Sequence, residues 1–530
     1  MTRAAAAIGA GLAPAREARR IVADERIHVV GIAGAGASAA ALLAGAAGAV
    51  VSGCDPGGPN PYTVALETVG VTLAWEHDRR HVLGARHPDR LAVTKALTAV
   101  DPNHPELAAA RWLDIPVEPW QQVVADAAAG RRLLAVAGTH GKSTSAGWLV
   151  HVLARAGRDP SAFVGALLPS ELTGGIPATA RHGRGPEFVV EADEYAGNFA
   201  AYRPSVSLVT NLEWDHPDVF EDRAAVIAAV EGWVRAAGGG SGTPAGRTPI
   251  LVANVADPGV AELVTNLADW PGRLIPVALL EGSPGHPSGY ARGMAEQYRT
   301  AGGPVAGVVI GRVRDAQQDA TVVELFGLDE LAGSTPVRLA TAGRHNAANA
   351  LGVAGVAYAL GVPPAAIVEG LATFPGVGRR LERLGETAGV VVYDDYGHHP
   401  TAIRETLAAV RQREPGRRIW AVYEPLTYHR TAALLEPFAD ALAGADAVAI
   451  AEIWAGRDTD RTVATAEGLA ISVAARAPSI PVEAPGSVEQ TAAFLADAVR
   501  QNDAVLVMGG GRSYQIGRLL LEALARRTDA

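Results

Sequence analysis

Short apolar runs alternate with alanine-rich, helix-like stretches along most of the chain. Residues 26–31 (RIHVVG) and 133–137 (LLAVA) are β-like runs that each lead through a glycine turn into a helical pattern, the second reaching position 156. A third set of β-like runs occupies 390–394, 418–423, 447–451 and 504–508. Helical patterns at 401–413 and 431–442 separate these runs. Alternating strands and helices predict an α/β fold with parallel sheets covered by helices.

Three segments break this alternation. Residues 32–51 carry no charge and are long enough to cross a bilayer. They are mostly alanine and glycine and follow a strand-like run, so a buried helix after a glycine turn is favoured over a membrane span. Residues 237–248 and 280–303 are rich in turn-forming residues and predict irregular surface loops. The first 25 residues mix charges with alanine and lack the apolar core of a secretory signal, so they form an N-terminal extension.

Composition narrows the classes that remain. The 530 residues are 48% hydrophobic and 19% charged, which excludes a disordered chain. The formal net charge of −10 argues against broad nucleic-acid binding, which favours a basic surface. Cys54 is the single cysteine, so neither a disulfide framework nor a cysteine-based zinc cluster is expected. Lys95 and Lys142 are the only lysines, so any position that needs an ammonium has few candidates.

One of these lysines lies in a glycine loop. Residues 138–144 (GTHGKST) stand between the β-like run 133–137 and a helical pattern. Glycines let backbone N–H groups surround phosphate oxygens, and the following helix N-terminus adds partial positive charge. The lysine would supply an ammonium to the terminal phosphates, and the next serine a hydroxyl to Mg²⁺. The loop therefore predicts a nucleotide site built from Gly138, Thr139, Gly141, Lys142, Ser143 and Thr144.

Two acidic strings follow apolar strands. Residues 189–198 (VVEADEYAGN) place Glu191, Asp193 and Glu194 at the carboxyl end of a strand, where carboxylates suit Mg²⁺. A solvated acidic loop is the alternative. Residues 210–218 (TNLEWDHPD) place His216 within reach of a metal or phosphate group, and a purely structural histidine is the alternative.

Four further strings lie in the second half of the chain. In GRHNAAN (343–349), Asn346 and Asn349 share one helical face and either read an adenine edge or cap the helix. Glycine turns precede an arginine pair in FPGVGRRLE (374–382), and DDYGHHP (394–400) follows an apolar strand. The glycines that open GGGRS (509–513) would make an anion-binding backbone nest.

Taken in this order, the strings resemble the motifs of the Mur ligase family, and within it those of the alanine-adding branch. The resemblance runs from about residue 26 to residue 517 and includes the early string GIAGAGASAAAL. It implies an α/β fold of three domains after the extension 1–25: Rossmann-like (26–131), P-loop ATPase-like with a parallel sheet (132–376), and Rossmann-like (377–530).

The resemblance also implies an activity. Such a ligase would form an amide between L-alanine and the carboxylate of UDP-N-acetylmuramate, through an acyl phosphate, in peptidoglycan precursor synthesis. ATP and Mg²⁺ would be its cofactors, and the sugar nucleotide and an L-amino acid its partners. It would be a cytoplasmic monomer or homodimer that binds neither nucleic acid nor membrane.

Roles follow at the matching positions. The catalytic residues implied are Lys142, His216, Arg380 and His398. ATP would contact the loop residues 138–144 together with Asn346, Asn349, Arg380 and Asp395. Ser143, Glu191 and His216 would hold Mg²⁺. The sugar nucleotide would contact Gly34, Ala35, Gly36, Ala37, Ser38 and Asp55, and the amino acid would contact Tyr396 and Arg430.

The number of lysines and two departures from the family's motifs help to identify the branch of the Mur ligase family that the chain resembles. Ligases that add later amino acids use a carbamylated lysine in the central domain, which is impossible here because no lysine follows Lys142. In EPLTYHRT (424–431), Leu426 and Thr427 replace cations of the alanine-adding pattern, so a recycling ligase that joins a murein tripeptide is the near alternative. A non-catalytic nucleotide-sugar binder is the distant one. Lys95 replaces a small residue and either contacts the diphosphate or lies on the surface.

Overall fold

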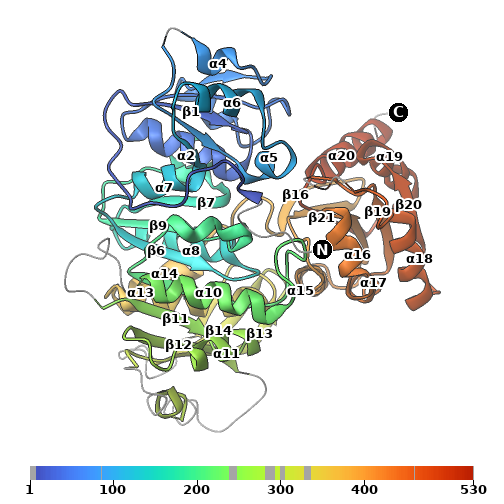
Figure 1. The fold of residues 1–530 in the computed structure, drawn as a ribbon. Helices are drawn as coiled ribbons and strands as arrows, with labels where there is room; N and C mark the ends of the chain where they lie inside the picture. The colour runs from blue at the N-terminus through green and yellow to red at the C-terminus, as the bar shows by residue number, and fades with distance from the viewer. Residues whose placement is uncertain are drawn as a thin grey trace.

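A computed structural model describes residues 8–84, 86–237, 248–280, 293–298, 305–327, 336–456, 458 and 460–528. The inserts expected at 237–248 and 280–303 lie mostly outside these residues. The described chain forms three α/β units, each built around its own sheet. The mixed α/β fold class is therefore confirmed. In Figure 1 the first unit stacks on the second, and the third lies beside it.

The first sheet is parallel and has the strand order β3-β2-β1-β4-β5. Its elements are β1 (Arg26–Val30), α2 (Ala35–Ala46), β2 (Val50–Cys54), α3 (Val64–Thr68), β3 (Thr72–Ala74), α4 (Arg80–Leu83), β4 (Arg90–Val93), α5 (Lys95–Val100), α6 (Pro105–Trp112), β5 (Val117–Pro119) and α7 (Trp120–Ala127). The uncharged stretch 32–51 is thus a buried helix followed by a strand. Among the described helices, none combines the length and apolarity that a bilayer crossing requires.

The second sheet has ten strands in the order β15-β14-β13-β12-β11-β10-β6-β9-β7-β8. Its first half comprises β6 (Arg132–Ala137), α8 (Lys142–Arg155), β7 (Ser161–Leu168), α9 (Ser170–Thr173), β8 (Ala178–Arg181), β9 (Glu187–Glu191), the 3₁₀ segment η1 (Tyr195–Ala201), β10 (Val206–Val209) and α10 (Arg223–Ala237). Its second half comprises β11 (Ile250–Asn254), α11 (Pro258–Asn266), β12 (Arg273–Leu280), β13 (Val309–Gln317), β14 (Ala320–Phe326), β15 (Pro336–Leu339), α13 (Arg344–Ala359) and α14 (Pro364–Ala372).

The third sheet has the order β16-β17-β21-β18-β19-β20. Its elements are β16 (Glu382–Thr387), β17 (Val390–Asp395), α15 (Pro400–Arg413), β18 (Arg418–Glu424), α16 (Tyr428–Ala433), α17 (Leu435–Leu442), β19 (Ala447–Ala451), α18 (Ala466–Arg476), β20 (Val482–Gly486), α19 (Val488–Ala498), β21 (Asp503–Gly509) and α20 (Tyr514–Thr528). The single helix expected at 431–442 is wrong, because the chain leaves helical geometry at Leu434 and divides it in two.

The expectation of purely parallel sheets is wrong at the sheet edges. Strands β8, β14, β15 and β16 run antiparallel to a neighbour. Two residues join β13 to β14, and two join β16 to β17, and connections so short can only reverse the chain. The parallel interior nevertheless brings the carboxyl ends of β6, β9 and β10 to one edge.

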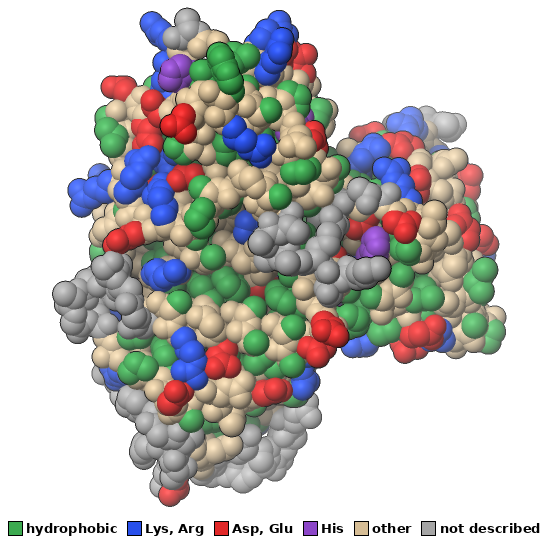
Figure 2. Space-filling view, viewed as in Figure 1, with side chains coloured by type: hydrophobic (Ala, Val, Ile, Leu, Met, Phe, Trp, Pro, Cys, Tyr) green, Lys and Arg blue, Asp and Glu red, His purple; other side chains and the backbone are tan. Residues whose placement is uncertain are grey.

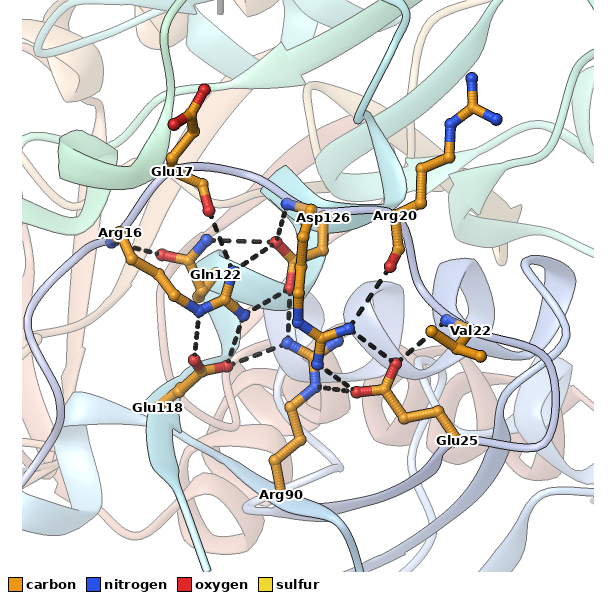
Figure 3. Close-up of polar contacts among 10 residues, drawn as sticks. Arg16, Glu17, Arg20, Val22, Glu25, Arg90, Glu118, Gln122 and Asp126 are labelled. Carbon is orange, nitrogen blue, oxygen red and sulfur yellow. Dashed lines mark hydrogen bonds and ion pairs between the residues drawn. The ribbon is translucent and has the colours of Figure 1, made fainter.

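The N-terminal extension is fastened to the first unit by buried charges (Figure 3). Arg16 donates to Glu118 at 2.7 Å and to Asp126 at 2.8 Å. Arg90, only 2% exposed, donates to the same two carboxylates at 2.9 and 2.5 Å and lies 3.0 Å from Glu25. These contacts join 8–25 to β4, β5 and α7, so the extension is part of the first unit.

The two domain junctions differ in chemistry. The first and second units share one continuous apolar core, in which Trp120 packs edge-on to Phe163 at 5.2 Å. Polar contacts join the second and third units, including Ser143 with Arg380 at 2.9 Å and Thr401 with Glu213 at 2.7 Å. On the face seen in Figure 2, charges of both signs are interspersed over all three units.

Replacing Arg90 by methionine should destabilise the first unit by about 3–5 kcal/mol, because buried carboxylates lose their common cation. The first transition in scanning calorimetry should move to lower temperature. The control is Arg80→Met, which removes an exposed arginine paired with Asp78 and should leave that transition unchanged. An R90M protein that melts like the wild type would show that the network contributes little.

Candidate active site

A cleft of about 1580 Å³ lies between the second and third units. Its walls include the phosphate loop, the carboxyl ends of β9 and β10, the start of α13, and the segments around Arg380 and His398. It therefore collects side chains from positions more than 250 residues apart. Every predicted catalytic, ATP, metal and amino-acid residue lines it except Gly138, which lies behind the loop.

The phosphate loop connects β6 to α8. Gly138 and Gly141 have φ angles of 132° and 76°, which favour glycine. A Cβ at Gly138 would lie 2.2 Å from the Thr210 hydroxyl, and one at Gly141 would lie 2.5 Å from the Asn349 amide oxygen. The tight turn therefore needs glycine at both positions. It leaves Lys142 at the first position of α8, where the helix dipole favours anions.

Lys142 is held by the acidic string. Its Nζ donates to the Gly138 carbonyl at 2.6 Å and to Glu194 at 3.0 Å, and it lies 3.7 Å from Asp193. Burial disfavours the ammonium, but the carboxylates of Glu194, Asp193 and Glu191 outweigh it and raise the pKa of Lys142. Lys142 therefore stays charged, and the carboxylates of Glu194 and Asp193 lie next to its ammonium beside the phosphate loop.

Two adjacent carboxyls share this ammonium, Glu194 being buried and Asp193 partly exposed. Burial and the charge of Asp193 raise the pKa of Glu194, although Lys142 opposes the shift. Burial opposes ionisation of Asp193 as well, but Lys142 and His216 lower its pKa. Asp193, Glu194 and His216 could together hold a metal ion. The oxygen donors suit Mg²⁺ better than the imidazole does, because Mg²⁺ prefers oxygen ligands.

Ser143 connects two domains through its hydroxyl. It donates to Glu191 at 3.1 Å and accepts a hydrogen bond from Arg380 at 2.9 Å. Glu191 also accepts the Gly165 backbone N–H at 2.7 Å. The Arg380 guanidinium lies over the Tyr396 ring at 5.0 Å. A cation from the third unit thus reaches the first turn of α8, beside the proposed metal ligands.

The asparagine pair lies at the start of α13, as the helical spacing predicted. Both side chains are 7% exposed, and Asn346 donates to the Ala342 carbonyl at 2.8 Å. Asp395, at the end of β17, accepts backbone N–H groups from Leu381 at 2.8 Å and Gly397 at 2.6 Å. Burial raises the pKa of Asp395, with Arg380 opposing it. Each of the two carboxylate oxygens of Asp395 therefore accepts one backbone N–H group.

His398 is a neutral imidazole. Its Nδ1 lies 2.9 Å from the Tyr396 carbonyl, which can only accept, so Nδ1 carries the proton and Nε2 keeps its lone pair. Burial and the nearby Arg430 hold the pKa of His398 well below its usual value. The ring therefore offers an acceptor rather than a charge to the cleft.

A pair that the sequence did not reveal joins the second and third units. Arg430 donates to Asp215 at 2.6 Å and to His216 Nδ1 at 3.1 Å, and its side chain is 3% exposed. Burial opposes the charge on Asp215, but Arg430 and His216 hold its pKa well below the usual value. The Arg430 Nε is buried and makes no hydrogen bond within the described residues. Part of this guanidinium is therefore still able to bind a carboxylate.

A second missed group lies across the same junction. His140, Glu213 and His399 bring their ligand atoms within 4.8 Å of one another. Burial opposes ionisation of Glu213, but His140, Thr401 and His399 lower its pKa to about 2. The signal in the sequence was the histidine inside the phosphate loop and the second histidine of GHHP, neither of which was assigned.

The predicted sugar-nucleotide residues lie apart from this cleft. Gly34 is exposed at the turn before α2, and Asp55 accepts backbone N–H groups from Ala33 at 3.1 Å and Gly57 at 2.8 Å. Ala37 and Ser38 are buried, and the Ser38 hydroxyl bonds Thr179 of the second unit at 3.1 Å. The Ser38 side chain thus joins two domains, and its contact with the sugar nucleotide stays a prediction.

Lys95 is not the surface lysine that was one of its two expected roles. Its Nζ donates to the Ala196 carbonyl of η1 at 2.7 Å, and a contact with the diphosphate stays a prediction. Burial lowers the pKa of Lys95 to about 8, although Asp193 opposes the shift. Both lysines of the chain thus converge on the acidic string and the segment that follows it.

Comparisons with known proteins agree with this geometry. The model described as "Mur ligase family, catalytic domain" matches residues 26–132, and that described as "Mur ligase, glutamate ligase domain" matches 379–511. A UDP-N-acetylmuramate–L-alanine ligase from Frankia casuarinae is 36% identical over 94% of this chain and 98% of its own length. One from Kineococcus radiotolerans is 37% identical, with coverages of 95% and 97%.

Solved structures share the fold. The UDP-N-acetylmuramate-alanine ligase from Thermotoga maritima matches with a TM-score of 0.71 and 22% identity, covering 95% of this chain and 100% of that one. A murein peptide ligase from Psychrobacter arcticus matches with a TM-score of 0.67 and 24% identity, covering 94% and 99%.

The fold of three α/β units and the cleft beside the phosphate loop define an ATP-dependent ligase assembled from several domains. The chain belongs to the Mur ligase family, and the curated relatives described above are named UDP-N-acetylmuramate–L-alanine ligase.

Replacing Asp215 by asparagine should loosen the junction between the second and third units. Removing one member of a buried ion pair costs about 3–5 kcal/mol, which shifts a two-state opening on the order of 100-fold or more. Small-angle scattering should then give a larger radius of gyration than for the wild type. Arg411→Ala, which removes an exposed pair within the third unit, is the control. Equal radii for D215N and wild type would contradict a clamping role.

Proposed function

We propose that this enzyme joins L-alanine to the carboxylate of UDP-N-acetylmuramate with ATP, releasing ADP and phosphate. The observation that carries the proposal is that Arg380 from the third unit donates to Ser143, the residue next to Lys142 in the phosphate loop. Such a site neutralises phosphate charge from two sides. The activity stated in the names of the curated relatives supports the choice of substrates.

The proposed reaction has two steps. A carboxylate oxygen of the sugar nucleotide attacks the γ-phosphorus of ATP, the bond to the β-bridging oxygen breaks, and ADP leaves. The amine of the amino acid then attacks the acyl carbon, and phosphate leaves with the former carboxylate oxygen. The incoming ammonium loses two of its three protons, one before the attack and one as the amide forms, and these pass to phosphate and solvent. The products are an amide, ADP and phosphate.

Charge neutralisation is the main work of the chain in the first step, since phosphoryl transfer needs alignment and compensation of charge. Nucleotide phosphates would take the Lys142 ammonium and the N–H groups of the loop, and Arg380 would approach the γ-phosphate. Ser143 and Glu191, with Asp193 and Glu194, offer the oxygen donors that Mg²⁺ requires. When bound, Mg²⁺ would neutralise and orient the phosphate oxygens.

The second step needs an amine with a free electron pair, held close to the acyl carbon. The Nε2 lone pair of His398 would accept a hydrogen bond from the amine and orient it. Arg430, whose Nε remains without a partner among the described residues, would bind the amino-acid carboxylate beside Tyr396. Asp395, Asn346 and Asn349 would contact the nucleoside of ATP.

The sugar nucleotide would bind at the turn before α2, through Gly34, Ala35 and Gly36, with Asp55 holding the turn. We assign the reaction to the cytoplasm, where its nucleotide substrates are made. The domain bounds 26–131, 132–376 and 377–530 agree with the strands of the three sheets. Analytical ultracentrifugation would distinguish a monomer from a homodimer.

A specific observation favours one alternative. Leu426 and Thr427 stand where the alanine-adding pattern has a histidine and an arginine, and Leu426, 8% exposed, lines the cleft with Arg430. A site with fewer cations binds a single amino acid less tightly and would accept a larger peptide. The recycling ligase, which joins a tripeptide, is therefore the second candidate.

A substrate panel separates the candidates. With UDP-N-acetylmuramate, ATP and Mg²⁺, we expect ADP release with L-alanine to exceed that with the murein tripeptide by at least tenfold in kcat/KM. Release supported by the tripeptide alone would overturn the leading assignment in favour of recycling. Release with neither would favour a non-catalytic binder.

The panel has a matched pair of variants on helix α8. Lys142→Met removes the ammonium and should lower kcat about 10²–10³-fold, as loss of one charge-stabilising donor does. Arg155→Met removes an exposed cation from the last turn of the same helix and should retain full turnover. Equal turnover by K142M and the wild type would show that ADP release does not come from this site.

A further inference from the structure

A second cluster of metal-ligating side chains lies in the first unit, outside the active-site cleft. His28 comes from β1, Cys54 from the end of β2, His81 from α4 and Glu106 from α6. One ligand atom from each lies within 4.8 Å of those of the other three. His28, Cys54 and Glu106 are buried, and His81 is half-buried. Four elements thus converge on one point at the end of the sheet.

The clearest sign of a missing partner is His28. This side chain is 2% exposed, and its Nε2 is buried without a hydrogen bond in the described structure. Its Nδ1 lies 2.9 Å from the Ser52 hydroxyl, which can donate or accept, so either ring tautomer fits that contact. The Nε2 atom faces a Glu106 oxygen at 3.6 Å, beyond hydrogen-bond distance. With the proton on Nδ1, the Nε2 lone pair and the carboxylate would share a cation.

Glu106 is the anionic centre of the cluster. Its side chain is fully buried, and its carboxylate oxygens lie close to ligand atoms of the other three side chains. The Cys54 Sγ lies 3.2 and 3.1 Å from the two carboxylate oxygens, and His81 Nδ1 lies 2.9 Å from one of them. A carboxylate and a sulfur in such close contact are ready to share one positive ion.

The number of charges fits a divalent ion. A thiolate and a carboxylate carry two negative charges, two neutral imidazoles carry none, and a divalent cation makes the buried set neutral. Zinc takes four N, O and S ligands at about 2.0–2.3 Å, which places neighbouring ligand atoms about 3.3–3.8 Å apart. The observed separations need only small side-chain adjustments to reach this arrangement.

We propose that His28, Cys54, His81 and Glu106 form a Zn²⁺ site. The single cysteine excludes a zinc cluster built on cysteines, but not this mixed set. His77, whose Nδ1 lies 3.2 Å from Cys54 Sγ, and His104, stacked edge-on against His77 at 4.4 Å, form its outer layer. Because Asp55 follows Cys54 directly and anchors the turn before α2, the ion would fix the end of β2 next to the sugar-nucleotide turn.

The competing occupant is a proton. If His28 and His81 are protonated, they pair with Glu106 as salt bridges, and Cys54 remains a thiol. The two states differ in a measurable way, because only metal binding converts the sulfur to a bound thiolate.

The test uses the full-length protein without a histidine tag, in excess Mg²⁺ so that oxygen-rich sites are filled. After dialysis against a trace of Zn²⁺, elemental analysis should give about one zinc per chain. With Co²⁺ in its place, a thiolate-to-cobalt charge-transfer absorption should appear, and it can come only from Cys54. No zinc above background and no such absorption would overturn the proposal.

Variants locate the site. Cys54→Ser should abolish the cobalt–thiolate absorption and weaken zinc binding at least tenfold, in line with the 10- to 100-fold cost of disturbing even the outer ligand layer. His87→Ala, which removes an exposed histidine of the same unit, is the control and should bind zinc like the wild type. If C54S fails to fold, the wild type alone decides, since zinc should raise its melting temperature and a chelator should lower it. A melting temperature indifferent to both would contradict the proposal.

Discussion

The ammonium of Lys142, balanced by the carboxylates that follow β9, is the interaction on which the cleft depends. A buried cation of this kind is costly unless anions compensate it, and Glu194 and Asp193 do so at 3.0 and 3.7 Å. The same contact fixes the acidic string against the phosphate loop. Glu191 is thereby placed beside Ser143, and Ser143 beside Arg380 of the third unit. One charge balance therefore aligns three segments from two domains.

The contrast between the two junctions explains how such a site can open and close. An apolar core that continues from the first unit into the second makes relative motion expensive, since it would expose buried surface. The polar contacts to the third unit, with Asp215–Arg430 at their centre, exchange more readily for water. Motion of the third unit would therefore admit substrates, and its return would bring Arg380, His398 and Arg430 to the reacting groups.

Local sequence patterns were enough to predict much of the fold and of the cleft. The phosphate loop, the strands that precede it and the acidic string, and the asparagine face of α13 follow from glycine chemistry and from periodicity over a few residues. Antiparallel edges were missed because two-residue connections reverse the chain without a strong turn signature. The contact of Ser38 with Thr179 could not be foreseen, because Thr179 lies far along the chain.

Contacts between distant segments were beyond the sequence. Nothing local indicates that Asp215 meets Arg430, that His140 and His399 share Glu213, or that Lys95 reaches Ala196. The His28–Cys54–His81–Glu106 cluster has no motif spacing either, because the topology of a parallel sheet, not adjacency, brings its four elements together. The first three of these contacts cross from one domain to another, and the cluster joins two strands and two helices of the first unit.

We propose that this charge-balanced cleft activates a carboxylate by phosphorylation. The most direct measurement uses UDP-N-acetylmuramate with a heavy isotope at both carboxylate oxygens, with mass spectrometry of the phosphate released during turnover with ATP and L-alanine. We expect one labelled oxygen in each phosphate, because the oxygen that attacks the γ-phosphorus leaves with it. Phosphate without label, formed at the same rate as the amide, would contradict the claim.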